Sequence, residues 1–166
     1  LPERRVAAVN TRYYGGITDW AMLYHAKYEE AGKIEARAWM DVSADMAATG
    51  LSRETMQTLV EIYGRAYPRV LDLARKLPDG TARLCPSNPD IVAQLHHALA
   101  EEMTVSLQDF LLRRTVIGQS ACLGLDCYEA IGHRMSALAG WSSRRLDAEL
   151  EAYHAAVERS LRFRSK

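Results

Sequence analysis

Five charged residues gather in the stretch from residue 101 to residue 114, and they are the side chains most able to do chemistry. They are Glu101, Glu102, Asp109, Arg113 and Arg114. Carboxylates beside guanidinium groups can act in acid–base catalysis, or they can pair and fix the geometry of two helices. No nucleophile or phosphate-binding loop accompanies them. We therefore favour the structural role and predict no catalytic residue.

Helical spacing places two of these charges among apolar side chains. If residues 91–103 form one helix, Glu102 falls inside its apolar stripe, and Arg114 falls within the apolar face of the following helix. A carboxylate that faces a core needs a partner. We therefore predict an internal ion pair between Glu102 and Arg114, with Asp109 and Arg113 paired at i,i+4 spacing on the flank. Loss of one partner of a buried pair costs about 3–5 kcal/mol.

Histidine and cysteine side chains are the candidate metal ligands. His96 and His97 are adjacent, so on a helix they point about 100° apart and do not easily share one metal ion. Cys122 and Cys127 with His133 lack the spacing of a metal motif, and small buried thiols are the favoured interpretation. We predict no metal-binding residue.

Motifs for nucleotides and signals of a membrane span are missing from the sequence. The run Tyr13-Tyr14-Gly15-Gly16 lacks the G-x-G-x-x-G spacing and a preceding strand, so we predict no cofactor-binding residue in this chain. Its 21 basic and 21 acidic residues give zero net charge, which argues against a nucleic-acid partner. No apolar run is long enough to cross a bilayer. Three cysteines fit reduced thiols in the cytoplasm better than a disulfide framework.

The basic tail leaves two interpretations open. Arg159, Arg162, Arg164 and Lys166 follow one another near the end of a predicted helix. They can complement the helix dipole, or they can make a weak peripheral contact with an anionic membrane surface, where each contributes only about 1 kcal/mol.

Turn signals divide the chain into about seven helical segments. We predict an all-α fold, a compact bundle of six to eight helices that are mostly antiparallel neighbours, without a significant sheet. Two early helices are expected, at 20–31 and from Ile34 to Gly50, with one kinked helix over both as the alternative. Residues 1–17 are expected to be an irregular lead, and 18–166 a single helical domain.

Later helices carry clearer start and stop signals. Capping residues are expected at Ser52, Asn88 (with Pro89 at the first helical position), Ser106, Asp126, and Ser142 or Ser143. Gly64 and Gly140 are expected to end two of these helices. Inward faces are predicted for Tyr128, Ile131, Met135 and Leu138, and then for Leu146, Leu150, Tyr153, Val157 and Leu161.

Several motifs, taken in order, carry a family resemblance. They are Thr11-Arg12-Tyr13-Tyr14-Gly15-Gly16, Tyr63-Gly64-Arg65-Ala66 with Val70-Leu71, Ala98 to Glu102, Leu107 to Thr115, and Gly140-Trp141. Together they resemble the C-terminal helical domain of FAD-dependent glycerol-3-phosphate dehydrogenases and the related glycerophosphate oxidases. The resemblance covers most of residues 11–153. Departures at Gln94, at His97 and at Tyr13-Tyr14 leave open the branch of the family and the electron acceptor.

The resemblance implies a parent enzyme that oxidises sn-glycerol 3-phosphate to dihydroxyacetone phosphate. In that family FAD takes the hydride, and the flavin and substrate residues lie in a preceding FAD-binding domain. We therefore expect this chain, which opens on Leu1, to be an excised helical cap domain that is inactive alone and has its own upstream FAD domain as partner. A homodimer and a location in the cytoplasm or peripheral on the inner membrane face are further expectations. The alternative is a free-standing interaction module anchored by Trp20, Trp39 or Trp141.

Overall fold

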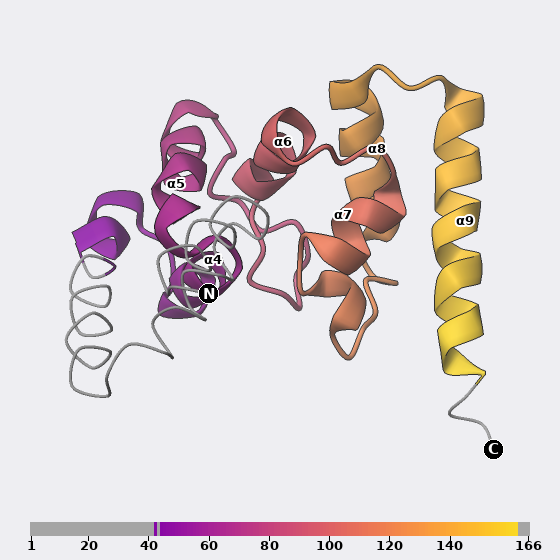
Figure 1. The fold of residues 1–166 in the computed structure, drawn as a ribbon, viewed down its shortest axis with the longest axis horizontal. Coiled ribbons are helices and arrows are strands. Elements are labelled where there is room, and N and C mark those ends of the chain that lie inside the picture. Colours follow the sequence, from indigo (N-terminus) through magenta and orange to yellow (C-terminus); the bar gives the residue numbers. More distant parts are fainter. Residues whose placement is uncertain (1–41, 43, 163–166) are drawn as a thin grey trace, which may run out of the picture. The chain divides into compact units, whose positions relative to one another are not determined.

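Residues 42 and 44–162 are described by the computed structural model of the chain (Figure 1). The chain divides into two compact units, Leu1–Thr81 and Ala82–Lys166, which are described in turn. The helix predicted at 20–31 and the first part of the one predicted from Ile34 to Gly50 lie outside the described residues. So do Trp20 and Trp39, on which the interaction-module alternative partly depends.

The first unit is built from short helices with well-satisfied ends. Residues 44–49 are helical and stop at Gly50, whose positive φ ends the helix. Helix α4 (Arg53–Tyr63) is capped as predicted, because the Ser52 hydroxyl accepts the Thr55 N–H at 3.2 Å. Helix α4 ends at Gly64, and the 3-10 turn η1 (Gly64–Ala66) leads into α5 (Tyr67–Lys76).

Asp45 ties the helical segment 44–49 to α5. Its carboxylate accepts a hydrogen bond from the Tyr67 hydroxyl at 2.9 Å and from the Arg75 guanidinium at 3.0 Å. Between these helices the core is apolar and fully buried, consisting of Met56, Leu59, Val70 and Leu71. The contacts of Asp45 therefore lie at the edge of this small core, outside its fully buried interior.

The described residues of the second unit, 82–162, form four helices and one 3-10 turn. They are α6 (Val92–Glu101), α7 (Leu107–Arg113), η2 (Ile117–Gln119), α8 (Tyr128–Ala139) and α9 (Ser143–Leu161). Helix α9 packs on α7 and α8, and Figure 1 shows it running antiparallel to α8 after the turn at Gly140. Ser106 caps α7 and Ser142 caps α9, as predicted.

Buried apolar side chains from all four helices form the core of the second unit. Its fully buried centre includes Leu95, Leu107, Phe110, Leu111, Ile117, Ile131, Met135 and Tyr153. Tyr153 also donates its hydroxyl to the carbonyl of Leu123 at 2.8 Å. This contact ties α9 to the irregular segment that precedes α8.

The predicted all-α class is confirmed. Among the described residues the extended pairing is limited to one isolated antiparallel bridge, between Arg83 and Ile91. None of the described helices combines the length and the apolar character needed to cross a membrane. Arg159 and Arg162 lie at the end of α9, while Arg164 and Lys166 lie outside the described residues. Membrane contact by the tail therefore stays a prediction.

Two predicted helix starts are wrong. Helix α6 begins after Ile91 instead of after Asn88, and it begins because the Gln94 side chain folds back to accept the Ile91 N–H at 2.8 Å. Helix α8 is preceded by Cys127 instead of being capped by Asp126. In both cases the side chain expected to cap a helix takes a tertiary partner.

Two predicted inward-facing leucines are also wrong. Leu138 is 45% exposed at the end of α8, and Leu161 is exposed at the end of α9. Each stands in the last turn of its helix, beyond the point where the neighbouring helix still covers it.

Candidate functional site

The corner between α6 and α7 joins the two predicted partners. Glu102 ends α6 and Arg114 ends α7. The Arg114 guanidinium donates to the backbone carbonyl of Glu102 at 3.0 Å and lies 4.0 Å from its carboxylate. The predicted pairing is therefore present, with its shorter contact made to the backbone.

The pair is less buried than the helical stripe suggested. The side chain of Glu102 is 20% exposed and that of Arg114 is 40% exposed. Burial raises the pKa of Glu102, while the charges of Arg114 and His97 act to lower it. Because the Arg114 end of the pair is exposed to solvent, loss of one partner costs less than the value of about 3–5 kcal/mol for a fully buried pair.

The turn between the two helices presents apolar side chains outward. Met103 adopts a left-handed backbone conformation, with φ at 54°, and its side chain is 90% exposed. Val105 is 63% exposed. A bulky residue at positive φ is unusual and marks a turn that its surroundings hold in place.

Helix α9 provides much of that support. The Arg145 guanidinium donates to the carbonyl of Val105 at 2.8 Å, and the Glu149 carboxylate accepts the N–H of Leu107 at 2.9 Å. Arg145 also stacks on the ring of Trp141, at 4.7 Å from its centre. Trp141 is thus partly covered by its own chain, which leaves less of it free to anchor a partner helix.

Of the remaining members of the charged set, Glu101 and Arg113 are exposed and Asp109 is half-buried. Asp109 and Arg113 form the predicted i,i+4 pair at 3.1 Å, and Glu101 is exposed at the end of α6. Within the described part of the chain, the side chains of the charged set bond to one another and to backbone, and to no hydroxyl or thiol nucleophile. The arrangement fixes the angle between two helices.

Asp90 is a buried carboxyl that sequence reasoning missed. It directly follows the predicted cap Asn88 and Pro89, and in that position it is expected to be an ordinary acidic residue in the first turn of a helix. It is fully buried just before α6, where its Oδ1 accepts the Gln94 amide at 3.0 Å. Its Oδ2 completes no hydrogen bond with the described residues. Burial raises the pKa of Asp90 to about 6, even though the Gln94 side chain and the Val116 backbone act to lower it.

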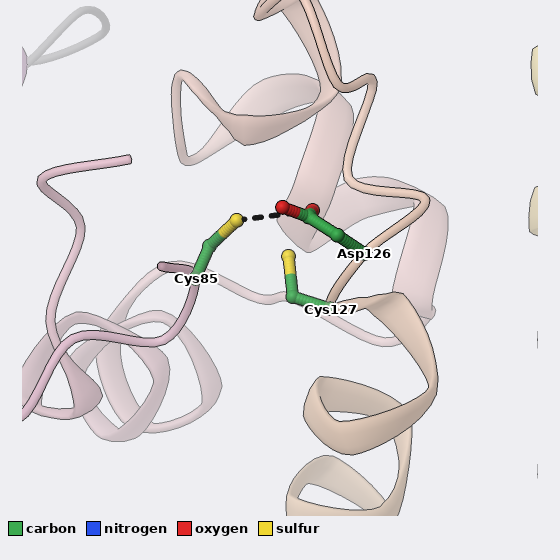
Figure 2. Close-up of side chains that lie close together, drawn as sticks. All are labelled: Cys85, Asp126 and Cys127. Atoms are coloured by element: carbon green, nitrogen blue, oxygen red, sulfur yellow. Dashed lines mark hydrogen bonds between the residues drawn. The ribbon is translucent and has the colours of Figure 1, made fainter. Parts of the chain in front are cut away.

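A group of thiols surrounds one carboxylate in the second unit, as Figure 2 shows for Cys85, Asp126 and Cys127. The Cys85 thiol donates to Asp126 Oδ1 at 3.3 Å, and the ligand atoms of these three residues lie within 4.8 Å of one another. Cys122 approaches the same point, because Asn88 Nδ2 donates both to its sulfur at 3.3 Å and to that of Cys85 at 3.2 Å.

The pKa values in this group reflect the different burial of its two thiols and its carboxylate. Cys85 and Cys127 are buried, and this burial raises the pKa of both thiols. Asp126 is exposed, and hydrogen bonds led by that of Cys122 lower the pKa of its carboxyl. Burial therefore favours the protonated form of both thiols, which lie beneath a solvent-facing carboxylate.

Sequence reasoning considered His133 with Cys122 and Cys127 and favoured small buried thiols instead. His133 indeed lies on the exposed side of α8, and Cys127 is buried, but the neighbours of these cysteines were not predicted. The true neighbours are Cys85 and Asp126. Cys85 and Cys127 stand in irregular segments about forty residues apart, where no helical period predicts proximity.

Comparison with known proteins identifies the family of this chain. Residues 12–146 match the family model for the C-terminal domain of alpha-glycerophosphate oxidase. The chain belongs to this family. The match includes the corner between α6 and α7 and both irregular segments that hold the thiols.

Relatives in this comparison are named as glycerol-3-phosphate dehydrogenases. The one from Synechocystis is 29% identical over 122 residues, which are 73% of this chain and 22% of that protein. Those from Mycobacterium leprae and Mycobacterium tuberculosis, the latter named glycerol-3-phosphate dehydrogenase 2, are 26% identical over 113 residues, or 68% of this chain and 19% of each. The chain spans about a fifth of the length of these relatives. No solved structure matches it significantly.

Proposed function

We propose that this chain is the helical C-terminal domain of an FAD-dependent glycerol-3-phosphate dehydrogenase, in which it serves as a structural cap on the flavin domain. The observation that carries the proposal is the family match over residues 12–146, together with relatives that bear this name and of which the matched segment covers about a fifth. The parent enzyme would oxidise sn-glycerol 3-phosphate to dihydroxyacetone phosphate, with FAD accepting the hydride.

The described residues do not fit the flavin itself. A dinucleotide cradle requires a strand, a glycine-rich turn and a helix N-terminus, whereas residues 42 and 44–162 offer helices and one isolated bridge. No step of the oxidation is therefore assigned to them. Their role is to supply a rigid, correctly angled surface.

Met103 and Val105 are the contact surface of this cap. Both present apolar side chains to solvent from a turn that Arg145 and Glu149 hold in place. Exposed apolar groups on a strained, well-supported turn are typical of a surface that another element covers. The element that covers Met103 and Val105 is the flavin domain, since about four-fifths of the length of the relatives lies outside the matched part.

The reading frame upstream of the codon for Leu1 gives the first test. A continuous frame that encodes a strand followed by G-x-G-x-x-G supports the proposal, and a stop codon directly upstream overturns it. The isolated chain is then mixed with FAD and glycerol 3-phosphate. We expect neither flavin retention nor substrate-dependent dye reduction, and turnover by the isolated chain would contradict the capping role.

Substitutions at the turn test the contact surface in the complete enzyme. Met103→Asp and Val105→Asp should leave the melting temperature of the isolated chain nearly unchanged, because both positions are exposed. In the complete enzyme they should lower the melting temperature and the flavin content. Leu138→Asp is the matched control, an exposed leucine away from the turn. An equal effect of all three substitutions would refute the assignment of this surface.

A further inference from the structure

The thiol group beside Asp126 is not used by the proposed capping role. It contains two buried sulfurs and one solvent-facing carboxylate, and among the described residues no salt bridge joins that carboxylate to a basic side chain. A small hydrophobic core explains a single buried cysteine well. It does not explain why the thiol of Cys85 meets the adjacent residues Asp126 and Cys127 from a segment about forty residues away.

The hydrogen bonds around the sulfurs are those that a thiolate accepts. Asn88 is buried, and its amide N–H₂ group donates to the sulfurs of Cys85 and Cys122. The backbone N–H of Ser87 also donates to the sulfur of Cys85. The turn Cys85-Pro86-Ser87-Asn88 therefore directs two N–H groups at the sulfur of Cys85, contacts that stabilise negative charge on that sulfur.

We propose that Cys85, Cys127 and Asp126 bind one divalent transition-metal ion, of which Zn²⁺ best suits two thiolates and a carboxylate. Soft sulfur ligands favour zinc over magnesium or calcium, and tetrahedral zinc commonly combines sulfur with other donors. Asp126 lies on the open side of the group, which gives the ion a path from solvent. Asn88 is a positioning residue that orients the sulfur of Cys85.

The geometry is close to that of a filled site. Zinc–sulfur bonds of about 2.3 Å place two tetrahedral ligands roughly 3.8 Å apart. The three ligand atoms already lie within 4.8 Å of one another. Closing the site therefore requires side-chain movements on the order of 1 Å, which small χ1 changes can supply without moving a helix.

Cobalt and zinc titrations of the 166-residue chain test this site. After treatment with a chelator and a phosphine reductant, Co²⁺ should produce the near-ultraviolet charge-transfer band of cobalt thiolate, and Zn²⁺ should abolish it in a stoichiometric amount. Zn²⁺ should also raise the melting temperature, because it binds the folded chain. Absence of the cobalt thiolate band overturns the proposal.

Variants separate the proposed ligands from their neighbours. Cys85→Ser and Cys127→Ser should lose the band, with circular dichroism checking that each remains helical. Asp126→Asn changes an exposed side chain and keeps its volume, so it tests binding without a risk to folding. It should abolish the rise in melting temperature with Zn²⁺. Asn88→Ala should weaken Co²⁺ binding by about 10- to 100-fold.

His133→Gln and Cys122→Ser are the matched controls. His133 is an exposed candidate ligand on α8, and its substitution should leave the Co²⁺ affinity unchanged. Cys122 lies beside the group but outside the set of three, so its substitution should keep the thiolate band. If Cys122→Ser loses the band as completely as Cys85→Ser, or if Asp126→Asn binds as the parent chain does, the ligand set is wrong. Neither result bears on the capping role.

Discussion

Asp90→Asn should stabilise the chain at neutral pH and should not do so in acid. The carboxyl of Asp90 has a pKa of about 6 in the folded chain, against an ordinary value of 3.8. Ionising it at pH 7 while it remains buried lowers the free energy of unfolding by about 3 kcal/mol. An amide has the same shape and carries no charge, so the variant removes this cost.

Hydrogen bonding reduces the net gain. The amide oxygen of the variant can still accept from Gln94, as Asp90 Oδ1 does at 3.0 Å. Its N–H₂ group would occupy the place of Oδ2, which completes no hydrogen bond with the described residues, and leaving it unsatisfied costs about 1 kcal/mol. We therefore expect a net gain of about 2 kcal/mol at pH 7, or roughly 4–8 °C in melting temperature.

The sign of the pH dependence follows from proton binding. Between about pH 4 and pH 6 the folded chain binds more protons at Asp90 than the unfolded chain, so the free energy of unfolding falls as the pH rises. At about pH 4.5 the cost of Asp90 has dropped to about 1 kcal/mol, and parent and variant should be nearly equal. The raised pKa of Glu102 acts in the same direction, but it cancels in the difference between the two chains.

Urea unfolding at several pH values measures this difference, and amide hydrogen exchange in α6 locates it. Exchange in α6 should slow in the variant at neutral pH, because Asp90 lies directly before that helix. A stability difference that stays constant from acid to neutral pH would refute the buried, raised-pKa carboxyl. So would a variant less stable than the parent at neutral pH.

Three further predictions concern single contacts in the second unit. Arg114→Leu should lower the free energy of unfolding in urea by about 1–2 kcal/mol, because the Glu102 carbonyl loses its hydrogen-bond donor and the Glu102 carboxylate loses its cation. An unchanged or higher melting temperature would show that the pair does not stabilise the fold. Met103→Gly should raise the melting temperature by the equivalent of about 0.5–1 kcal/mol, since glycine tolerates the positive φ and little packing is lost; a fall would mean that the turn carries no strain. Tyr153→Phe should cost about 0.5–1.5 kcal/mol through its hydrogen bond to Leu123, and calorimetry that finds no loss would contradict this contact.

Local signals predicted the helix ends well, and tertiary contacts account for the failures. Ser52, Ser106 and Ser142 cap their helices because each hydroxyl needs only an N–H three residues ahead. Asn88 and Asp126 are equally good capping types, yet Asn88 donates to the sulfur of the distant Cys122, and Asp126 accepts from the hydroxyl of the distant Ser87. A capping rule contains no information about such competitors.

The Glu102–Arg114 pair and the thiol group beside Asp126 also differ in how far local sequence signals predicted them. The pairing of Glu102 with Arg114 was predictable, because two regular helices joined by a short turn bring their ends together. The extent of its exposure was not, since this depends on which elements cover the corner. Cys85 and Asp126 meet through irregular backbone about forty residues apart, so only their residue types gave a signal.

The position of α9 in the chain has a consequence for synthesis. Helices α7 and α8 leave the ribosome before α9, and the side chains that later cover them, Tyr153 and Val157, belong to α9. Until α9 emerges, their apolar faces stay open and the carbonyl of Leu123 lacks its hydroxyl donor. The second unit therefore closes late, and a premature stop before Tyr153 would leave a nascent chain with an uncovered core for chaperones and proteases to recognise.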